Sequence, residues 1–222
     1  MTASPDSTPP PEEDDDSGVV LERAARTHSM VLLRDGLARA ALVSHSAPRR
    51  LLLFVHGFGG KAVNTWSGMG NFDASDDFWA EADLVFFDYD SLRESIKGVA
   101  DRLRRCIDLY YPTPNAALSG NDLGELRSSD SPDYEELLVV GHSLGGLVAR
   151  KAVADAFTQW QAASSDGDTV RPATLAASLR LFSPASAGVR LAGVAGSFQK
   201  AHLTDWLEAW LYQSAAFQDL LP

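Results

Sequence analysis

The stretch that most constrains the fold is residues 136–151, which read ELLVVGHSLGGLVARK. Four apolar residues run into a glycine, a serine follows, and from Leu144 onward the apolar residues recur at helical spacing. This pattern predicts a buried strand that turns directly into a helix, with Ser143 on the turn between them. A strand of this kind needs apolar neighbours on both faces, which favours a sheet covered by helices.

The glycines around this serine have a steric explanation. A turn this tight holds Ser143 in a backbone conformation that side-chain-bearing residues disfavour. The residues two before and two after the serine approach each other so closely that a Cβ would clash, so Gly141 and Gly145 are needed there. Gly146 allows the helix to pack close to the sheet. We interpret His142 as a packing residue whose imidazole points away from the serine.

The same kind of pattern extends through the chain. Apolar runs alternate with segments whose apolar residues recur every three or four positions, which predicts an α/β fold with a mostly parallel sheet and helices on both faces. A capping box of Ser91 and Glu94 is expected to begin one of the helices. The predicted strands are 38–46, 51–55, 82–90, 137–140 and 177–188, the last one buried, and the predicted helices are 76–81, 91–111 and 144–160.

A second glycine-rich turn, HGFGG at residues 56–60, follows the strand at 51–55. In open α/β sheets, ligands bind at the carboxyl ends of the strands, where both glycine-rich turns are expected to lie. The Leu144 N–H at the start of its helix can stabilise developing negative charge. We expect a second such donor from this turn, first Phe58 and then Gly57, with His56 orienting the turn by hydrogen bonding.

The two motifs FVHGFGG and VVGHSLGG together resemble those of the α/β-hydrolase superfamily, in its lipase and serine-esterase branch, and are similar to GPI inositol-deacylase-like lipid esterases. The resemblance covers roughly residues 45–190, and LFSPASAG resembles the turn after the following strand in such lipases. It implies hydrolysis of a carboxylic ester, of a lipid or another apolar acyl group, through an acyl-enzyme on Ser143. It also implies an oxyanion hole and no cofactor.

The resemblance also implies a catalytic acid and a histidine after the serine. His202 is the only histidine after Ser143, and its surroundings have a helical pattern instead of a loop after a buried strand. We therefore expect the N-terminal part of a longer hydrolase domain, with the last strands, acid and base beyond this sequence. The alternative is that His202 is the base, oriented by Asp205, Asp166 or Asp168. Two further alternatives are a catalytically incompetent binding module and an acyltransferase.

Composition excludes some functions and suggests a location. The chain has 222 residues and a net charge of -11, so nucleic acid would be repelled. Residues 1–17 hold six carboxylates and four prolines without Lys or Arg, which predicts a disordered leader before a hydrolase domain at 18–222. No secretory signal or spanning segment is predicted, and a single cysteine, Cys106, fits a reducing compartment; we expect a cytoplasmic protein.

The remaining candidates receive structural interpretations. His28 and His45 are expected at the surface, and the five dispersed histidines with one cysteine show no metal-ligand spacing. Cys106 is interpreted as structural. Asp88 and Asp90 are at the end of the predicted strand 82–90, on the reactive edge, where we expect them to shape the pocket.

The C-terminal segment HLTDWLEAWLYQSAAFQDLLP has an apolar, aromatic face at near-helical spacing. We expect this face to pack against the sheet or the rest of the protein. The alternative is peripheral contact with an acyl chain or a membrane surface, which predicts binding to liposomes. The aromatic residues concerned are Trp206, Trp210, Tyr212 and Phe217.

Overall fold

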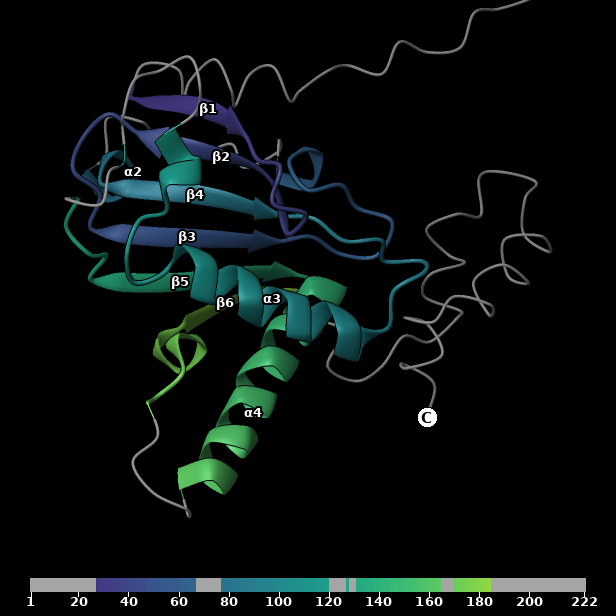
Figure 1. Ribbon diagram of the computed structural model, residues 1–222. Helices are drawn as coiled ribbons and strands as arrows, with labels where there is room; N and C mark the ends of the chain where they lie inside the picture. The colour runs from purple at the N-terminus through teal and green to yellow at the C-terminus, as the bar shows by residue number, and fades with distance from the viewer. Residues whose placement is uncertain (1–26, 67–76, 120–126, 128–130, 165–169, 185–222) are drawn as a thin grey trace, which may run out of the picture.

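The structure is a computed structural model, and it describes residues 27–66, 77–119, 127, 131–164 and 170–184 (Figure 1). The predicted leader at 1–17, the C-terminal aromatic segment, His202 and its three candidate acids lie outside these residues.

The described residues form one six-stranded sheet, in the order β1-β2-β4-β3-β5-β6 (Figure 1). The four strands from β4 to β6 are parallel to one another, whereas β1 pairs antiparallel with β2 and β2 antiparallel with β4. The expectation of a mostly parallel sheet is therefore confirmed. The strands are β1 (His28–Leu32), β2 (Ala38–Ser44), β3 (Arg50–Val55), β4 (Ala82–Phe87), β5 (Glu136–His142) and β6 (Ser178–Phe182).

Helices cover both faces of this sheet. The longer helices α3 (Ile96–Tyr110) and α4 (Leu144–Ser164) pack on one face, against alternate residues such as Leu53 and Val85. The intervening residues, such as Phe54 and Phe86, face a second core that includes Trp66 and the short helix α2 (Asp77–Ala80). Three short 3-10 helices complete the described elements: η1 (Asn64–Trp66), η2 (Ala116–Ser119) and η3 (Ala173–Ala176).

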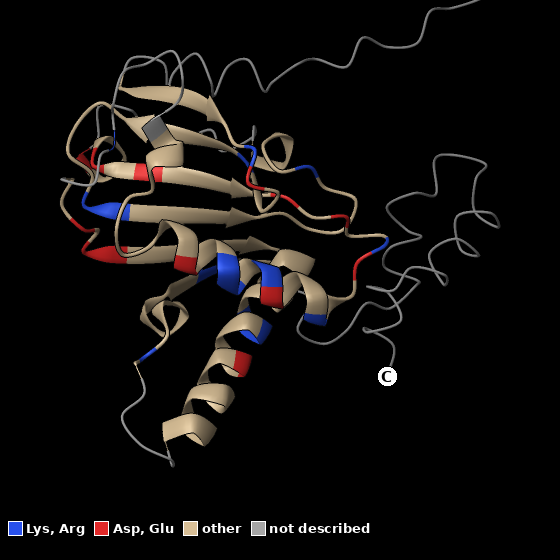
Figure 2. Ribbon diagram, in the orientation of Figure 1, with Lys and Arg blue, Asp and Glu red and all other residues tan. Residues whose placement is uncertain are grey.

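Ion pairs join neighbouring strands at the amino ends of β3 and β5, where blue and red segments lie side by side (Figure 2). The Arg49 guanidinium lies 2.6 Å from the Glu135 carboxylate, and Arg50 Nε lies 3.0 Å from Glu136. The Arg49–Glu135 pair is largely exposed and therefore contributes little to stability, whereas the Arg50 side chain is mostly buried.

A buried carboxylate organises the sheet edge opposite the carboxyl ends of the parallel strands. Asp83, near the start of β4, is fully buried and accepts two hydrogen bonds from the Arg127 guanidinium, at 2.6 and 2.8 Å. It also accepts the Tyr134 hydroxyl at 2.6 Å and the Ser44 N–H at 2.8 Å. A buried charge is tolerated only when paired and hydrogen-bonded in this way.

Helix α3 begins later than the sequence predicted. It starts at Ile96, with Ser95 as the N-cap, whose side chain accepts the Gly98 N–H at 3.2 Å. The predicted capping serine, Ser91, instead accepts a hydrogen bond from Gly59 in the loop after β3. The Ser91 hydroxyl therefore makes a tertiary hydrogen bond in place of the helix-capping bond that the local sequence predicted.

Two burial predictions are wrong. Strand β6 was expected to be buried, but it has no fully buried residue and Phe182 is 55% exposed, because β6 is the last strand in the order of the described sheet. His28 was expected at the surface but is buried, and its Nε2 lies 3.0 Å from the Ala82 carbonyl oxygen across β2 and β4. His45 is exposed, as expected.

The buried Asp83 network gives a stability prediction. Asp83→Ala leaves the Arg127 guanidinium buried without its counter-charge, so the free energy of unfolding should fall by about 3–5 kcal/mol. Urea denaturation measures it. The matched control is Glu135→Ala, which breaks an exposed ion pair and should have a far smaller effect. Equal losses in the two variants would contradict a structural role for Asp83.

Candidate active site

Ser143 lies on the turn between β5, which ends at His142, and α4, which begins at Leu144. Its φ is 51°, in the left-handed region that side-chain-bearing residues rarely adopt. Its N–H donates to the Phe182 carbonyl oxygen of β6 at 2.9 Å, and its own carbonyl accepts the Gly146 N–H at 3.1 Å. The half-buried serine side chain therefore stands at the carboxyl ends of the central parallel strands.

The glycines of this turn lie where no Cβ fits. A Cβ on Gly145 would lie 2.2 Å from the Val55 carbonyl oxygen and 2.4 Å from that of His56. On Gly141 it would lie 2.7 Å from the Gly146 Cα, and on Gly146 it would lie 3.0 Å from the Pro184 Cβ. The start of α4 thus packs directly against the end of β3.

This close approach brings the two glycine-rich motifs together. A Cβ on Gly57 would lie 3.0 Å from the Ser143 Cβ and 3.0 Å from the His142 Nδ1. His142 is exposed, and its ring lies edge-on to Trp66, with centroids 6.3 Å apart. Segments more than 80 residues apart in sequence therefore form one site at the sheet edge.

Some backbone amides at this site donate hydrogen bonds within the protein, and others do not. In the turn 57–60, the Gly59 N–H donates to Ser91 Oγ at 2.9 Å, and the Gly60 N–H donates to the Gly57 carbonyl at 3.1 Å. Within the described part of the chain, no acceptor is recorded for the amides of Gly57 and Phe58. Leu144 heads α4, where amides lack an intrahelical acceptor and the helix dipole favours negative charge.

His56 is fully buried beneath the turn. Its Nδ1 lies 2.8 Å from the Gly57 carbonyl oxygen, which fits an Nδ1–H donor. Its Nε2 lies 3.8 Å from the Asp88 carboxylate and has no hydrogen-bond partner among the described residues. Burial lowers the pKa of the His56 imidazole, against smaller raising effects of Gly57 and Asp88, so the ring is neutral near pH 7.

The loop after β4 supplies contacts that the sequence reasoning missed. The Tyr89 hydroxyl donates to the His56 carbonyl oxygen at 2.7 Å, and its ring stacks on the imidazole with centroids 4.2 Å apart. Tyr89 and Ser91 come shortly after β4, and the HGFGG turn comes directly after the adjacent parallel strand β3. This shared position at the carboxyl ends of neighbouring strands could have predicted that the two segments are in contact. Asp90, which we expected to shape the pocket, accepts the Leu92 N–H at 3.0 Å within its own loop.

Several further predictions concern features away from the serine. Cys106 is buried in α3, and burial raises the pKa of its thiol, in keeping with a structural residue. Across the described ranges, no group of three or more His, Cys, Asp or Glu side chains is arranged to hold a metal ion. None of the helices described there combines the length and apolar character needed to cross a membrane.

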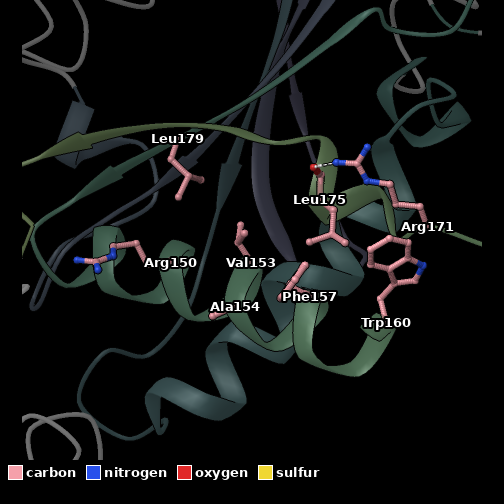
Figure 3. Close-up of a pocket in the computed structure, with 8 residues that line it drawn as sticks. All are labelled: Arg150, Val153, Ala154, Phe157, Trp160, Arg171, Leu175 and Leu179. Carbon is pink, nitrogen blue, oxygen red and sulfur yellow. Dashed lines mark hydrogen bonds between the residues drawn. The ribbon is translucent and has the colours of Figure 1, made fainter. Parts of the chain in front are cut away.

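A hollow of about 720 Å³ lies beside α4 (Figure 3). Neither Ser143 nor the turn 57–60 is among its lining residues. Its walls are mostly apolar and come from α4, η3 and β6, with an arginine from α4 and another from the segment before η3. The Arg171 guanidinium donates to the Leu175 carbonyl oxygen at 2.7 Å. The lining residues are Arg150, Val153, Ala154, Phe157, Trp160, Arg171, Leu175 and Leu179.

A mostly parallel sheet covered by helices on both faces, with a serine on a strand–helix turn at its carboxyl edge, defines the α/β-hydrolase fold. A family model described as the PGAP1-like alpha/beta domain matches residues 64–162, which include β4, α3, β5 and Ser143. The resemblance to this superfamily that the motifs indicated is thereby confirmed. No curated protein matches the chain in sequence.

Solved structures of lipases and esterases are also similar to the chain. A lipase from Bacillus licheniformis is 16% identical with a TM-score of 0.42, and the match covers 79% of this chain and 56% of the lipase. Esterase B from Lactobacillus rhamnosis is 11% identical with a TM-score of 0.46, over 92% and 67% of the two chains. A putative lipase from Acinetobacter baumannii is 14% identical with a TM-score of 0.43, and the match covers 96% of this chain and 60% of the lipase. The chain thus spans little more than half of the first of these proteins.

The close packing at Gly145 predicts a large effect of one methyl group. Gly145→Ala should lower the free energy of unfolding by at least about 3 kcal/mol, because the clash is with backbone that cannot move aside. Thermal and urea unfolding measure it. Gly98→Ala in α3 is the control, since its nearest atom is Ser95 Oγ at 3.3 Å; it should change stability by less than about 1 kcal/mol. A tolerated Gly145→Ala would contradict the observed packing.

The buried histidines predict a loss of stability in mild acid. Burial lowers the pKa of both His28 and His56 in the folded protein, so below about pH 6.5 the unfolded chain binds more protons. Their contribution is complete above that pH and is lost as the pH falls through the folded pKa values.

The free energy of unfolding, measured in urea between pH 7 and pH 5, should therefore decrease with falling pH, by up to about 1.4 kcal/mol per pH unit for each group. His28→Gln should flatten this dependence, because it removes one of the two buried imidazoles. An unaltered slope in His28→Gln would rule out a contribution from His28.

Proposed function

We propose that this protein is a serine hydrolase that cleaves carboxylic esters, with Ser143 as the nucleophile. The observation that carries the proposal is the left-handed backbone of Ser143 on a strand–helix turn, in contact with the glycine-rich turn after the neighbouring strand. A protein retains such a strained residue only where the surrounding packing enforces it, and sites of this kind cluster at active sites.

In the proposed reaction, Ser143 Oγ attacks the carbonyl carbon of the ester as its proton passes to a base. The carbonyl oxygen becomes negatively charged, and the amides of Leu144 and Phe58, with Gly57 as the alternative to Phe58, stabilise it. Collapse of this intermediate expels the alcohol and leaves an acyl group on the serine, which water then removes. Each donor typically contributes about 2.7–4 kcal/mol to lowering the barrier.

The contacts of the turn favour these donors over the other amides. The Gly59 and Gly60 amides already donate to Ser91 and Gly57, and the Ser143 amide donates to Phe182. A donor already engaged would have to break its bond to bind the oxyanion, so Phe58, Gly57 and Leu144 remain. His202 is the candidate base, with Asp205, Asp166 or Asp168 as its acid, if the base belongs to this chain.

We further propose a lipid or another apolar acyl ester as the substrate, on the resemblance of the two motifs to those of lipid esterases. Acyl transfer to an acceptor other than water would use the same serine. A binding module without a catalytic base is the competing function. Activity measurements separate these possibilities, because only a complete catalytic set gives turnover dependent on Ser143.

The test is labelling with a fluorophosphonate probe, followed by hydrolysis of p-nitrophenyl esters from acetate to palmitate. We expect labelling and turnover that Ser143→Ala abolishes, with higher rates on longer acyl chains. The matched control is Ser183→Ala, because Ser183 also follows a strand and has a positive φ of 45°. Labelling that survives Ser143→Ala would refute the assignment. A folded chain that neither labels nor turns over would favour either the binding module or a hydrolase domain whose acid and base are not among these 222 residues.

A further inference from the structure

The turn 57–60 is held in place by the loop that follows β4. We propose that Tyr89 and Ser91 are positioning residues, which fix this turn so that its free amides face the oxygen of the reacting ester. The inference rests on the proposed function, since it concerns the proposed oxyanion donors. Both residues lie outside the two glycine-rich motifs.

Tyr89 holds the first residue of the HGFGG segment by two contacts. The side chain is buried, its hydroxyl donates to the His56 carbonyl oxygen at 2.7 Å, and its ring lies 4.2 Å from the imidazole at an interplanar angle of 14°. Because His56 Nδ1 in turn bonds to the Gly57 carbonyl, the position of Tyr89 sets the direction of the peptide that precedes Phe58.

Ser91 holds the other side of the turn. Its Oγ accepts the Gly59 N–H at 2.9 Å, and Gly59 has a positive φ of 67°, the residue at which the chain reverses. Ser91 is 4% exposed, so water does not readily replace this acceptor. With the peptides before and after Phe58 both fixed, the Phe58 amide has little freedom to rotate.

The loop that carries these residues is itself anchored to α3. Arg102 Nη1 of α3 donates to both carboxylate oxygens of Glu94, at 2.6 and 2.7 Å, and Arg102 Nη2 donates to the Asp88 carbonyl oxygen at 3.1 Å. Glu94 also accepts the Asp90 N–H at 2.8 Å. These bonds hold both ends of the segment that contains Tyr89 and Ser91, so the backbone that carries the two side chains is fixed in position.

This arrangement has a kinetic consequence. Preorganised donors lower the barrier because they need no reorientation as charge develops, and a displacement of about 1 Å can cost about 10²-fold in rate. A residue that only positions such a donor should affect kcat more than KM, since the oxyanion exists only in the transition state and the intermediate.

The experiment compares Ser91→Ala and Tyr89→Phe with the wild-type chain in p-nitrophenyl ester hydrolysis. We expect each change to lower kcat by about tenfold with KM within about twofold, and Ser91→Thr, which keeps the hydroxyl, to restore most of the rate. The matched control is Ser95→Ala. It removes a hydroxyl from the end of the same loop, but Ser95 caps α3 and makes no recorded contact with the turn, so kcat should not change.

Hydrogen exchange of the Phe58 and Gly59 amides, followed by NMR, gives a readout that does not need turnover. Exchange should be faster in Ser91→Ala and unchanged in Ser95→Ala. If the wild type labels at Ser143 but Ser91→Ala and Tyr89→Phe keep their kcat, the inference is overturned and the proposed function stands. If the wild type does not label, this chain lacks a complete catalytic set and kinetics give no readout, so exchange alone decides. Unchanged protection in Ser91→Ala then overturns the inference, and lost protection supports the holding of the turn.

Discussion

The contact between the start of α4 and the end of β3 is the constraint on which the rest of the site depends. The Cα of Gly145 lies against the carbonyl groups of Val55 and His56 with no room for a methyl group. Because the helix can approach the strand this closely, the serine before it reaches the turn after β3. A longer side chain at this position would separate the two motifs, and with them Ser143 from the turn that follows β3.

Much of this arrangement follows from local sequence. The apolar runs at 51–55 and 137–140 are long enough to be buried strands, and the helical spacing after Ser143 extends into α4. The spacing of apolar residues could not show that Ser95, and not Ser91, caps α3. The Ser91 hydroxyl accepts a hydrogen bond from the Gly59 N–H, which is 32 residues away in the chain. His28 was placed wrongly because its partner, the Ala82 carbonyl, belongs to a strand 54 residues later.

The two edges of the sheet use polar groups in opposite ways. At the amino edge, each oxygen of Asp83 accepts hydrogen bonds from buried partners, which leaves no acceptor position open for a ligand. At the carboxyl edge, His56 keeps one ring nitrogen without a partner among the described residues, and two amides of the turn lack a recorded acceptor. Polar groups left unsatisfied cost stability. Among the described residues, Trp160 Nε1 is likewise buried without a partner, beside the hollow next to α4, so this cost is not confined to the carboxyl edge.

The bond from the Ser143 amide to Phe182 couples the serine to the exposed strand β6. Strand β5 thus leads into Ser143, β3 packs against the start of α4, and β6 accepts a hydrogen bond from the Ser143 backbone nitrogen. Strand β6 (Ser178–Phe182) follows α4 in the chain, and its last residue, Phe182, is largely exposed to solvent. The position of the Ser143 amide therefore depends on β6 through a single hydrogen bond, so a displacement of β6 would act directly on the backbone of the strand–helix turn.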